Sequence, residues 1–126
     1  MAFPRIEHVN VTVTDPERAA RLMEALFDWK VRWQGPARDG GRAIHVGSDV
    51  HYIALYTDAN ATYTEEDFVK GRPLNHIGVE VDDLDATEAR VIAAGLVPFS
   101  HGDYEPGRRF YFFDPDGIEY EVVSYG

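Results

Sequence analysis

Two histidines stand at matching places in two similar stretches of this 126-residue sequence. The stretch EHVNVTVTD covers residues 7–15, the stretch NHIGVEVDD covers residues 75–83, and His8 and His76 each follow the first residue of their stretch. The chain has no cysteine, which excludes a disulfide scaffold, a thiolate zinc site and a cysteine nucleophile. Any bound metal would therefore need histidine and carboxylate ligands, and the two histidines are the first candidates.

The residues around both histidines alternate as they do in a β-strand. A shift of 68 residues superimposes the two stretches without a gap, so that Val9 matches Ile77. In each copy the β-branched residues alternate with the histidine and with other polar residues, which is a period of two. Each stretch is predicted to form a strand with one apolar and one polar face, and both histidines belong to the polar face.

Each predicted strand leads into a predicted helix. Thr14 or Asp15 can cap a helix within residues 14–29, where apolar residues recur at helical spacing. The segment 82–95 again begins with acidic residues that can cap a helix and ends at a glycine, which predicts a second helix. The apolar side of this second helix is predicted to consist of Leu84, Val91 and Ile92.

Three short strands are predicted after each helix, separated by glycine and proline. They cover residues 30–34, 42–47, 51–57, 97–101, 108–114 and 118–125. The chain is thus predicted to have an α+β fold and to form a single domain, residues 1–126, of two repeated βαβββ modules. The modules occupy residues 4–57 and 73–125, joined by a connector over residues 58–72 that includes a helical turn at 65–69.

A second internal match joins the last strands of the two modules. A shift of 67 residues lays the segment YIALY on the segment EYEVV, so that Ala54 matches Glu121. In the second of these strands, glutamates alternate with apolar residues and therefore face away from the apolar side. If the apolar face of each sheet covers its helix, His8, His76 and Glu121 lie on the opposite face and could converge.

The paired modules, the opening H-[VI]-x-V-x-V of each and the segment FYFFDPDGIEYEVV resemble the vicinal oxygen chelate superfamily. This superfamily includes glyoxalase I, bleomycin-resistance proteins, fosfomycin-resistance transferases and extradiol dioxygenases. The resemblance covers essentially the whole chain, and its most specific part is Asp-Pro-Asp-Gly at 114–117, with Glu121 four residues after the glycine. It implies a curved mixed sheet with a concave cleft and with helices on the outer face. It also implies a divalent metal ion, one of Fe, Mn, Ni, Co or Zn, held by His8, His76 and Glu121, with Ala54 at the fourth ligand position.

The resemblance implies an enzyme that binds a small substrate through two adjacent oxygens at this metal. Because glyoxalase I has a carboxylate where this chain has Ala54, the resemblance is weaker for that reaction. Lyase or isomerase chemistry and ring-cleaving dioxygenase chemistry both remain open. The alternative is a metal-free protein of the bleomycin-resistance type that sequesters a hydrophobic or cationic small molecule in the same cleft.

Further side chains are candidates for the site around the metal. His101 and Tyr104 belong to a segment with glycine and proline, where family members place groups that contact substrate, and either is a candidate acid or base. Three tyrosines are candidates for the walls of a substrate pocket, namely Tyr52, Tyr56 and Tyr111.

For two other histidines and two arginines, the sequence favours roles outside the metal site. Strand parity places His51 on the face opposite Ala54, and His45 is predicted to be a solvated residue at a strand edge. Arg108 and Arg109 are candidates to pair with an anionic substrate group, but surface ion pairs are the favoured prediction, because the chain is rich in acidic residues.

The composition restricts the partners. Twelve basic against twenty-two acidic residues give a formal charge of −10, which argues against nucleic acid and anionic lipid as partners. The sequence lacks a long apolar run and an evident leader segment, so we expect a cytoplasmic protein without a membrane span. The resemblance implies a homodimer, with a cleft formed either within one chain or across the dimer.

Overall fold

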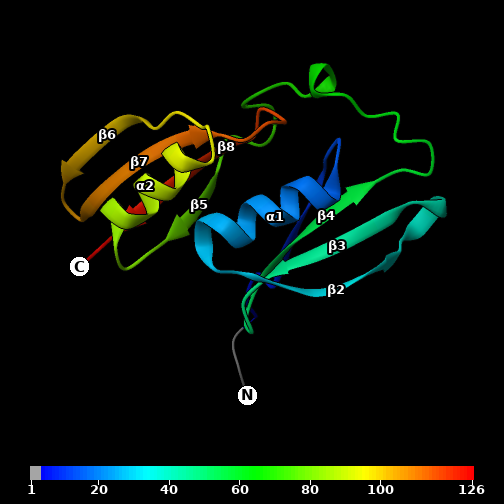
Figure 1. The fold of residues 1–126 in the computed structure, drawn as a ribbon, viewed down its shortest axis with the longest axis horizontal. Helices are drawn as coiled ribbons and strands as arrows, with labels where there is room; N and C mark the ends of the chain where they lie inside the picture. Colours follow the sequence, from blue (N-terminus) through cyan, green and yellow to red (C-terminus); the bar gives the residue numbers. More distant parts are fainter. Residues whose placement is uncertain (1–3) are drawn as a thin grey trace. The chain divides into compact units, whose positions relative to one another are not determined.

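The computed structural model describes residues 4–126, which form two compact units. The first unit ends at Thr64 and the second begins at Glu65. Each unit contains one four-stranded mixed sheet with one helix beside it (Figure 1). The predicted α+β fold of two βαβββ modules is confirmed. No helix in this part of the chain combines the length and the apolar character that a membrane crossing requires.

The first module contains six elements along the chain. They are β1 (His8–Thr12), α1 (Pro16–Phe27), β2 (Lys30–Pro36), the 3-10 turn η1 (Arg38–Gly40), β3 (Arg42–Gly47) and β4 (Tyr52–Thr57). The sheet order is β1-β4-β3-β2, and only β1 and β4 run parallel. The Asp15 carboxylate accepts the Arg18 N–H at 3.1 Å, so Asp15 is the one of the two predicted caps that caps α1, and Pro16 suits its first turn.

The second module repeats this arrangement. It contains the 3-10 turn η2 (Glu65–Asp67), β5 (Ile77–Glu80), α2 (Leu84–Ala93), β6 (Phe99–Tyr104), β7 (Gly107–Phe113) and β8 (Glu119–Ser124), with sheet order β5-β8-β7-β6. The Asp83 carboxylate caps α2 through the Ala86 N–H at 3.0 Å. Leu84 and Val91 are buried as predicted, but Ile92 is 58 % exposed, so its predicted place in the apolar stripe is wrong.

One face of each sheet packs against its helix, and the hydrophobic core lies between them. In the first module this core joins Ala19, Met23 and Leu26 of α1 to buried residues of β3 and β4, among them Ile44 and Leu55. We call this side of each sheet the helix face and the other side the open face. Because side chains alternate along a strand, the residues between these core positions belong to the open face.

The registers of the two sheets are equivalent. In the first sheet, Trp33, His45, Ala54 and Asn10 stand opposite one another across β2, β3, β4 and β1. In the second sheet, the corresponding row across β6, β7, β8 and β5 is Phe99, Tyr111, Glu121 and Gly78. Ala54 and Glu121 therefore occupy the same place on the open face, as the repeat predicts.

An irregularity interrupts the strand at the edge of each sheet. In β2 one extra residue lies between Val31, which pairs with Val46, and Trp33, which pairs with His45. In β6 the extra residue lies between Phe99 and Gly102, where Ser100 has a φ of 53°. Such a bulge reverses the alternation of side chains, so parity along these two strands does not hold across it.

Candidate functional site

Glu121 is the centre of a polar cluster on the open face of the second module. Its Oε1 lies 3.0 Å from His76 Nε2, and its Oε2 accepts a hydrogen bond from Arg109 Nη1 at 3.0 Å. The side chains of Glu121 and Arg109 are each only 13 % exposed, so this ion pair is shielded from water. The β7–β8 register and the start of β5 thus bring together two of the predicted metal ligands, His76 and Glu121.

The hydrogen bonds of His76 restrict its protonation. Its Nδ1 lies 2.8 Å from Asn75 Oδ1, an acceptor, so this nitrogen carries a proton. A neutral imidazole has only one ring proton, which leaves Nε2 with a lone pair that faces the carboxylate oxygen of Glu121. His76 Nε2 and Glu121 Oε1, 3.0 Å apart, are therefore placed as neighbouring donor atoms that one cation could bind.

His8 has the same local arrangement in the first module. Its Nδ1 lies 3.0 Å from Oε1 of the preceding residue, Glu7. This leaves Nε2 as the ring nitrogen that could bind a metal. This contact with His8 lowers the pKa of the Glu7 carboxyl. In both modules, therefore, an oxygen of the residue before the histidine binds Nδ1. This arrangement is typical of metal-binding histidines, in which a hydrogen bond at one nitrogen orients the other toward the metal.

Arg109 was predicted to form a surface ion pair, and this prediction is wrong. Its guanidinium lies 4.7 Å from the ring centroid of Tyr104, and its Nε and Nη2 atoms are buried without a hydrogen-bond partner within residues 4–126. The reason is strand parity: Arg109 alternates with Phe110 and therefore shares the open face with Glu121. Parity along β7 was the signal that the sequence offered. Arg108, in contrast, forms the predicted exposed ion pair, with Asp85 at 3.0 Å.

Two of the predicted site tyrosines lie beside the Glu121 cluster. Tyr104 covers Arg109, and the Tyr111 ring meets the His76 ring edge-on, with 5.8 Å between their centroids. Burial and the neighbouring Glu121 carboxylate raise the pKa of Tyr111, so this phenol stays protonated at neutral pH and can donate a hydrogen bond.

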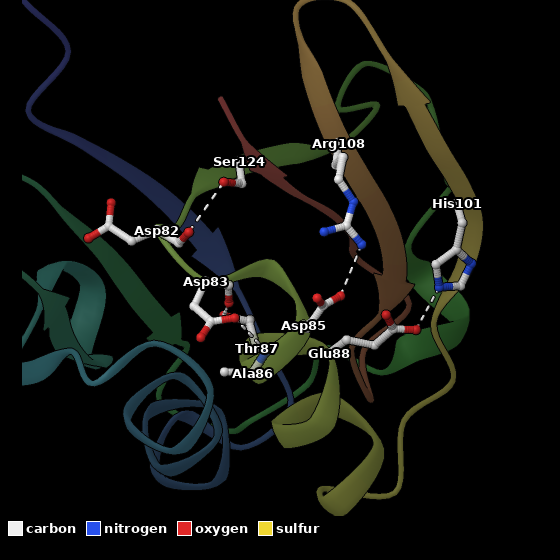
Figure 2. A network of polar contacts seen from close by, with 9 residues as sticks. All are labelled: Asp82, Asp83, Asp85, Ala86, Thr87, Glu88, His101, Arg108 and Ser124. Atoms are coloured by element: carbon white, nitrogen blue, oxygen red, sulfur yellow. Dashed lines mark hydrogen bonds and ion pairs between the residues drawn. The ribbon is translucent and has the colours of Figure 1, made fainter. Parts of the chain in front are cut away.

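His101 lies on the other side of the same sheet. Its Nε2 lies 2.6 Å from Glu88 Oε2 of α2, and its ring stacks on Phe110, which is fully buried in the core. Figure 2 shows the side chains of His101 and Arg108 pointing toward α2, where they contact Glu88 and Asp85, respectively. The structure therefore does not bring His101 to the face that carries Glu121.

The open face of the first module carries a row of stacked rings. The Tyr52 ring stacks on His8 and on His45, with centroid distances of 4.8 Å and 4.4 Å, and the Arg32 guanidinium lies 4.7 Å from the same ring. His45 also contacts Trp33 at 4.9 Å. Burial, together with the nearby His8 and Arg32, lowers the pKa of His45, so that this imidazole is neutral at pH 7.

A pocket of about 720 Å³ lies on the open face of the first module. The residues that matter for its chemistry are Asn10, Thr12, Trp33, Arg38, His45 and Tyr56. Tyr56 lines this pocket, and Tyr52 lies in the ring stack beside it. His45 was predicted to be solvated, but it is partly buried between Trp33 and Tyr52.

The predicted metal ligands are brought together only in part within the described residues. Residues 4–126 contain no group of three His, Asp or Glu side chains assembled for a metal ion. The second module does supply two donor atoms, His76 Nε2 and Glu121 Oε1, close enough to be neighbouring ligands of one ion, and His8 belongs to the other unit. The donor set of imidazole nitrogen and carboxylate oxygen suits Mn, Fe, Co, Ni and Zn.

Comparison with known proteins places these features in a family. A model of the "Glyoxalase/Bleomycin resistance protein/Dioxygenase superfamily" matches residues 5–122. A "Probable trivalent organoarsenical cleaving enzyme" of Bacillus subtilis (strain 168) is 30 % identical over 122 residues, which cover 90 % of this chain and 75 % of the relative.

Solved structures share the fold across the whole chain. TnmS3, an antibiotic binding protein from Streptomyces sp. CB03234, is 22 % identical, with a TM-score of 0.76 over 100 % of this chain and 99 % of that one. The fosfomycin resistance protein FosX from Listeria monocytogenes, in complex with Mn(II) and sulfate, is 15 % identical, with a TM-score of 0.75 over 98 % and 93 % of the two chains. Proteins with this fold thus include one solved with Mn(II) and one that binds an antibiotic. With its paired modules, its repeated histidine and its family match over residues 5–122, the chain belongs to the glyoxalase/bleomycin resistance protein/dioxygenase superfamily.

Proposed function

We propose that this chain is a metal-dependent enzyme that acts on a small molecule at a divalent ion held by His8, His76 and Glu121. The observation that carries the proposal is the pair of histidines whose Nδ1 atoms bind oxygens of Glu7 and Asn75. This leaves both Nε2 atoms as lone-pair donors, and one of them already faces Glu121. The Mn(II) complex of FosX supports the same chemistry for a protein with this fold.

When bound, the metal would supply Lewis acidity toward a substrate that chelates it through two oxygens. The side chains around it have separate tasks. Arg109 holds the Glu121 carboxylate in one orientation, and its ion pair is shielded from solvent. Tyr111 is protonated and can donate a hydrogen bond to an oxygen of the substrate, and Tyr104 covers Arg109 on the solvent side. The Bacillus relative, a probable cleaving enzyme, supports a bond-cleaving reaction, which fits both lyase chemistry and ring-cleaving dioxygenase chemistry.

Metal content tests this proposal directly. The protein is purified without chelator, loaded with Mn(II), Fe(II), Ni(II), Co(II) or Zn(II), desalted and measured by elemental analysis. We expect about one ion per chain in the wild type, and strong loss in His8→Ala, in His76→Ala and in Glu121→Gln. His101→Gln is the matched control, because its imidazole is bound to Glu88 on the helix face, and it should retain the ion. Equal metal content in His76→Ala and in His101→Gln would refute the proposed ligand set.

The same variants test whether the ligands come from one chain or from two. If the site is formed across a homodimer, a mixture of His8→Ala and His76→Ala chains contains heterodimers with one intact ligand set. We propose the dimer, as the family resemblance implies, and expect metal binding to recover in the mixture after partial unfolding and refolding. No recovery, with heterodimers demonstrated by mass spectrometry, would assign all three ligands to a single chain.

The second candidate function is metal-free binding of a small molecule. The pocket of the first module favours it, because its polar and aromatic lining is complete without a metal. TnmS3 supports this alternative, since it is an antibiotic binding protein with the same fold. Absence of stoichiometric metal from the wild type after loading with all five ions would select this function over the enzyme.

A further inference from the structure

The pocket of the first module has aromatic walls. Trp33 is 46 % exposed there, although a tryptophan gains free energy by leaving water. The bulge in β2 turns Trp33 to the open face, and its ring lies across Gly35, where an added Cβ would come within 2.8 Å of the ring. The indole therefore lies against the backbone of its own strand and lines the pocket. Tyr56 supplies a second ring, and its hydroxyl reaches the Arg38 carbonyl oxygen at 3.5 Å.

The polar lining of the pocket offers one cation and several hydrogen-bonding groups. Within residues 4–126 the Arg38 guanidinium forms no ion pair, although it stands beside Asp39 in the turn η1. His45 is neutral at pH 7 and offers one donor and one acceptor nitrogen. Asn10 and Thr12 add neutral polar groups from β1.

The charge of the chain is distributed unequally between its units. Residues 1–64 carry seven Lys and Arg against eight Asp and Glu, whereas residues 65–126 carry five against fourteen. The first unit is therefore nearly neutral while the second is strongly acidic. An anionic ligand meets little general repulsion at a pocket of the first unit, and the Arg38 charge can decide between ligands there.

We infer that this pocket binds a planar aromatic compound with an anionic substituent, such as an aryl carboxylate. The ring lies against Trp33 and Tyr56, and the anionic group pairs with Arg38 at the rim, assisted by a hydrogen bond from His45 or Asn10. A volume of about 720 Å³ accommodates a bicyclic ring system. The inference rests on the proposed binding of a small molecule and names the class of that ligand. It does not require the metal, because every residue in it belongs to the first module.

Three naphthalene compounds that differ only in charge test the inference. Binding of 2-naphthoate, 2-naphthylmethanol and 2-naphthylmethylamine is measured by calorimetry at pH 7.5 in the presence of EDTA. We expect the carboxylate to bind at least tenfold more tightly than the alcohol, and the amine to bind least. The inference is overturned if the alcohol or the amine binds as tightly as the carboxylate, or if none of the three binds at millimolar concentration.

Matched variants locate the binding. Arg38→Gln should weaken 2-naphthoate about tenfold and leave 2-naphthylmethanol unchanged, the loss expected for one charge-assisted hydrogen bond. Arg21→Gln is the control, because it removes the same charge from an exposed position on α1 and should change neither affinity. Asp39→Asn should leave 2-naphthoate binding equal or tighter. Equal losses in Arg38→Gln and Arg21→Gln would place the anion elsewhere.

The two tryptophans of the chain provide a readout that does not depend on affinity. In ¹⁵N-labelled protein the indole signal of Trp33 is identified by its absence from Trp33→Leu. Addition of 2-naphthoate should shift this signal, while the signal of Trp29, which packs against Phe27 and His51, should stay in place. All these titrations contain EDTA and therefore do not depend on a bound metal. A negative titration leaves the proposed metal site untested, and a negative metal-content measurement does not change the expected titrations.

Discussion

Replacing Asp114 by alanine should destabilise the second module strongly, because this one carboxylate holds the turn before β8. Asp114 Oδ1 accepts the backbone N–H groups of Asp116 and Ile118, both at 2.9 Å. The surrounding residues are buried: Asp114 is 8 % exposed, Asp116 2 % and Ile118 3 %. The turn carries Glu121 into place, since β8 begins at Glu119.

The magnitude follows from the groups that lose their acceptor. A hydrogen bond to a charged group contributes about 1.5–3 kcal/mol, and a buried N–H without a partner retains the full cost of its desolvation. Two such donors give a loss of about 3–5 kcal/mol in the free energy of unfolding for Asp114→Ala, a large part of the typical stability of a domain. Asp114→Asn keeps a neutral oxygen acceptor at the same place and should lose about half as much.

Urea denaturation followed by far-UV circular dichroism measures this loss, because the signal reports β-structure in both units. Tryptophan fluorescence is unsuitable, since both tryptophans belong to the first unit. Asp103→Ala is the matched control: Asp103 is an exposed acid of the same module, and its removal should change the stability by less than about 0.5 kcal/mol. If Asp114→Ala unfolds at the same urea concentration as Asp103→Ala, the carboxylate does not hold this turn and the reasoning is refuted.

Three further changes test other parts of the structure. Asn75→Ala should weaken metal binding about 10- to 100-fold, because it frees His76 Nδ1, while the exposed Asn60→Ala should not; equal affinities in isothermal titration would contradict this role. His45→Gln should reduce the loss of stability that the wild type shows as the pH falls below 6.5. The pKa of His45 is lowered in the folded state, so the unfolded chain binds the proton first and the wild type is destabilised at low pH. Urea titrations at several pH values will measure the difference. Asp83→Ala should cost about 1 kcal/mol through loss of the α2 cap, and an unchanged thermal midpoint would exclude that cap.

The sequence predicts the fold well because the repeat carries more information than either copy alone. Two alignments without gaps, at shifts of 68 and 67 residues, place Ala54 and Glu121 at equivalent positions, and the strand registers confirm it. Helix caps also depend on the local sequence: Asp15, one of the two residues predicted to cap α1, does so, and an acidic residue, Asp83, caps α2.

The positions that the sequence did not predict follow from the bulges. His101 shares parity with Phe99, but the extra residue in β6 turns it toward α2 and Glu88. In β2 the extra residue turns Trp33 to the open face, where no alternation of residues would have placed it. A single inserted residue leaves no signature in composition or spacing, because it depends on the fit of one edge strand to its neighbour.

The equivalence of Ala54 and Glu121 has a consequence for how this protein can diverge. The first module has a methyl group, that of Ala54, where the second module has the carboxylate of Glu121. The first module therefore does not have to preserve a carboxylate at this position, whereas the second does. Substitutions around Trp33 and Arg38 can therefore alter which compounds are accepted while His76, Arg109 and Glu121 stay untouched. If the proposed functions hold, ligand preference can change through the first module while the proposed metal ligands His76 and Glu121 are conserved.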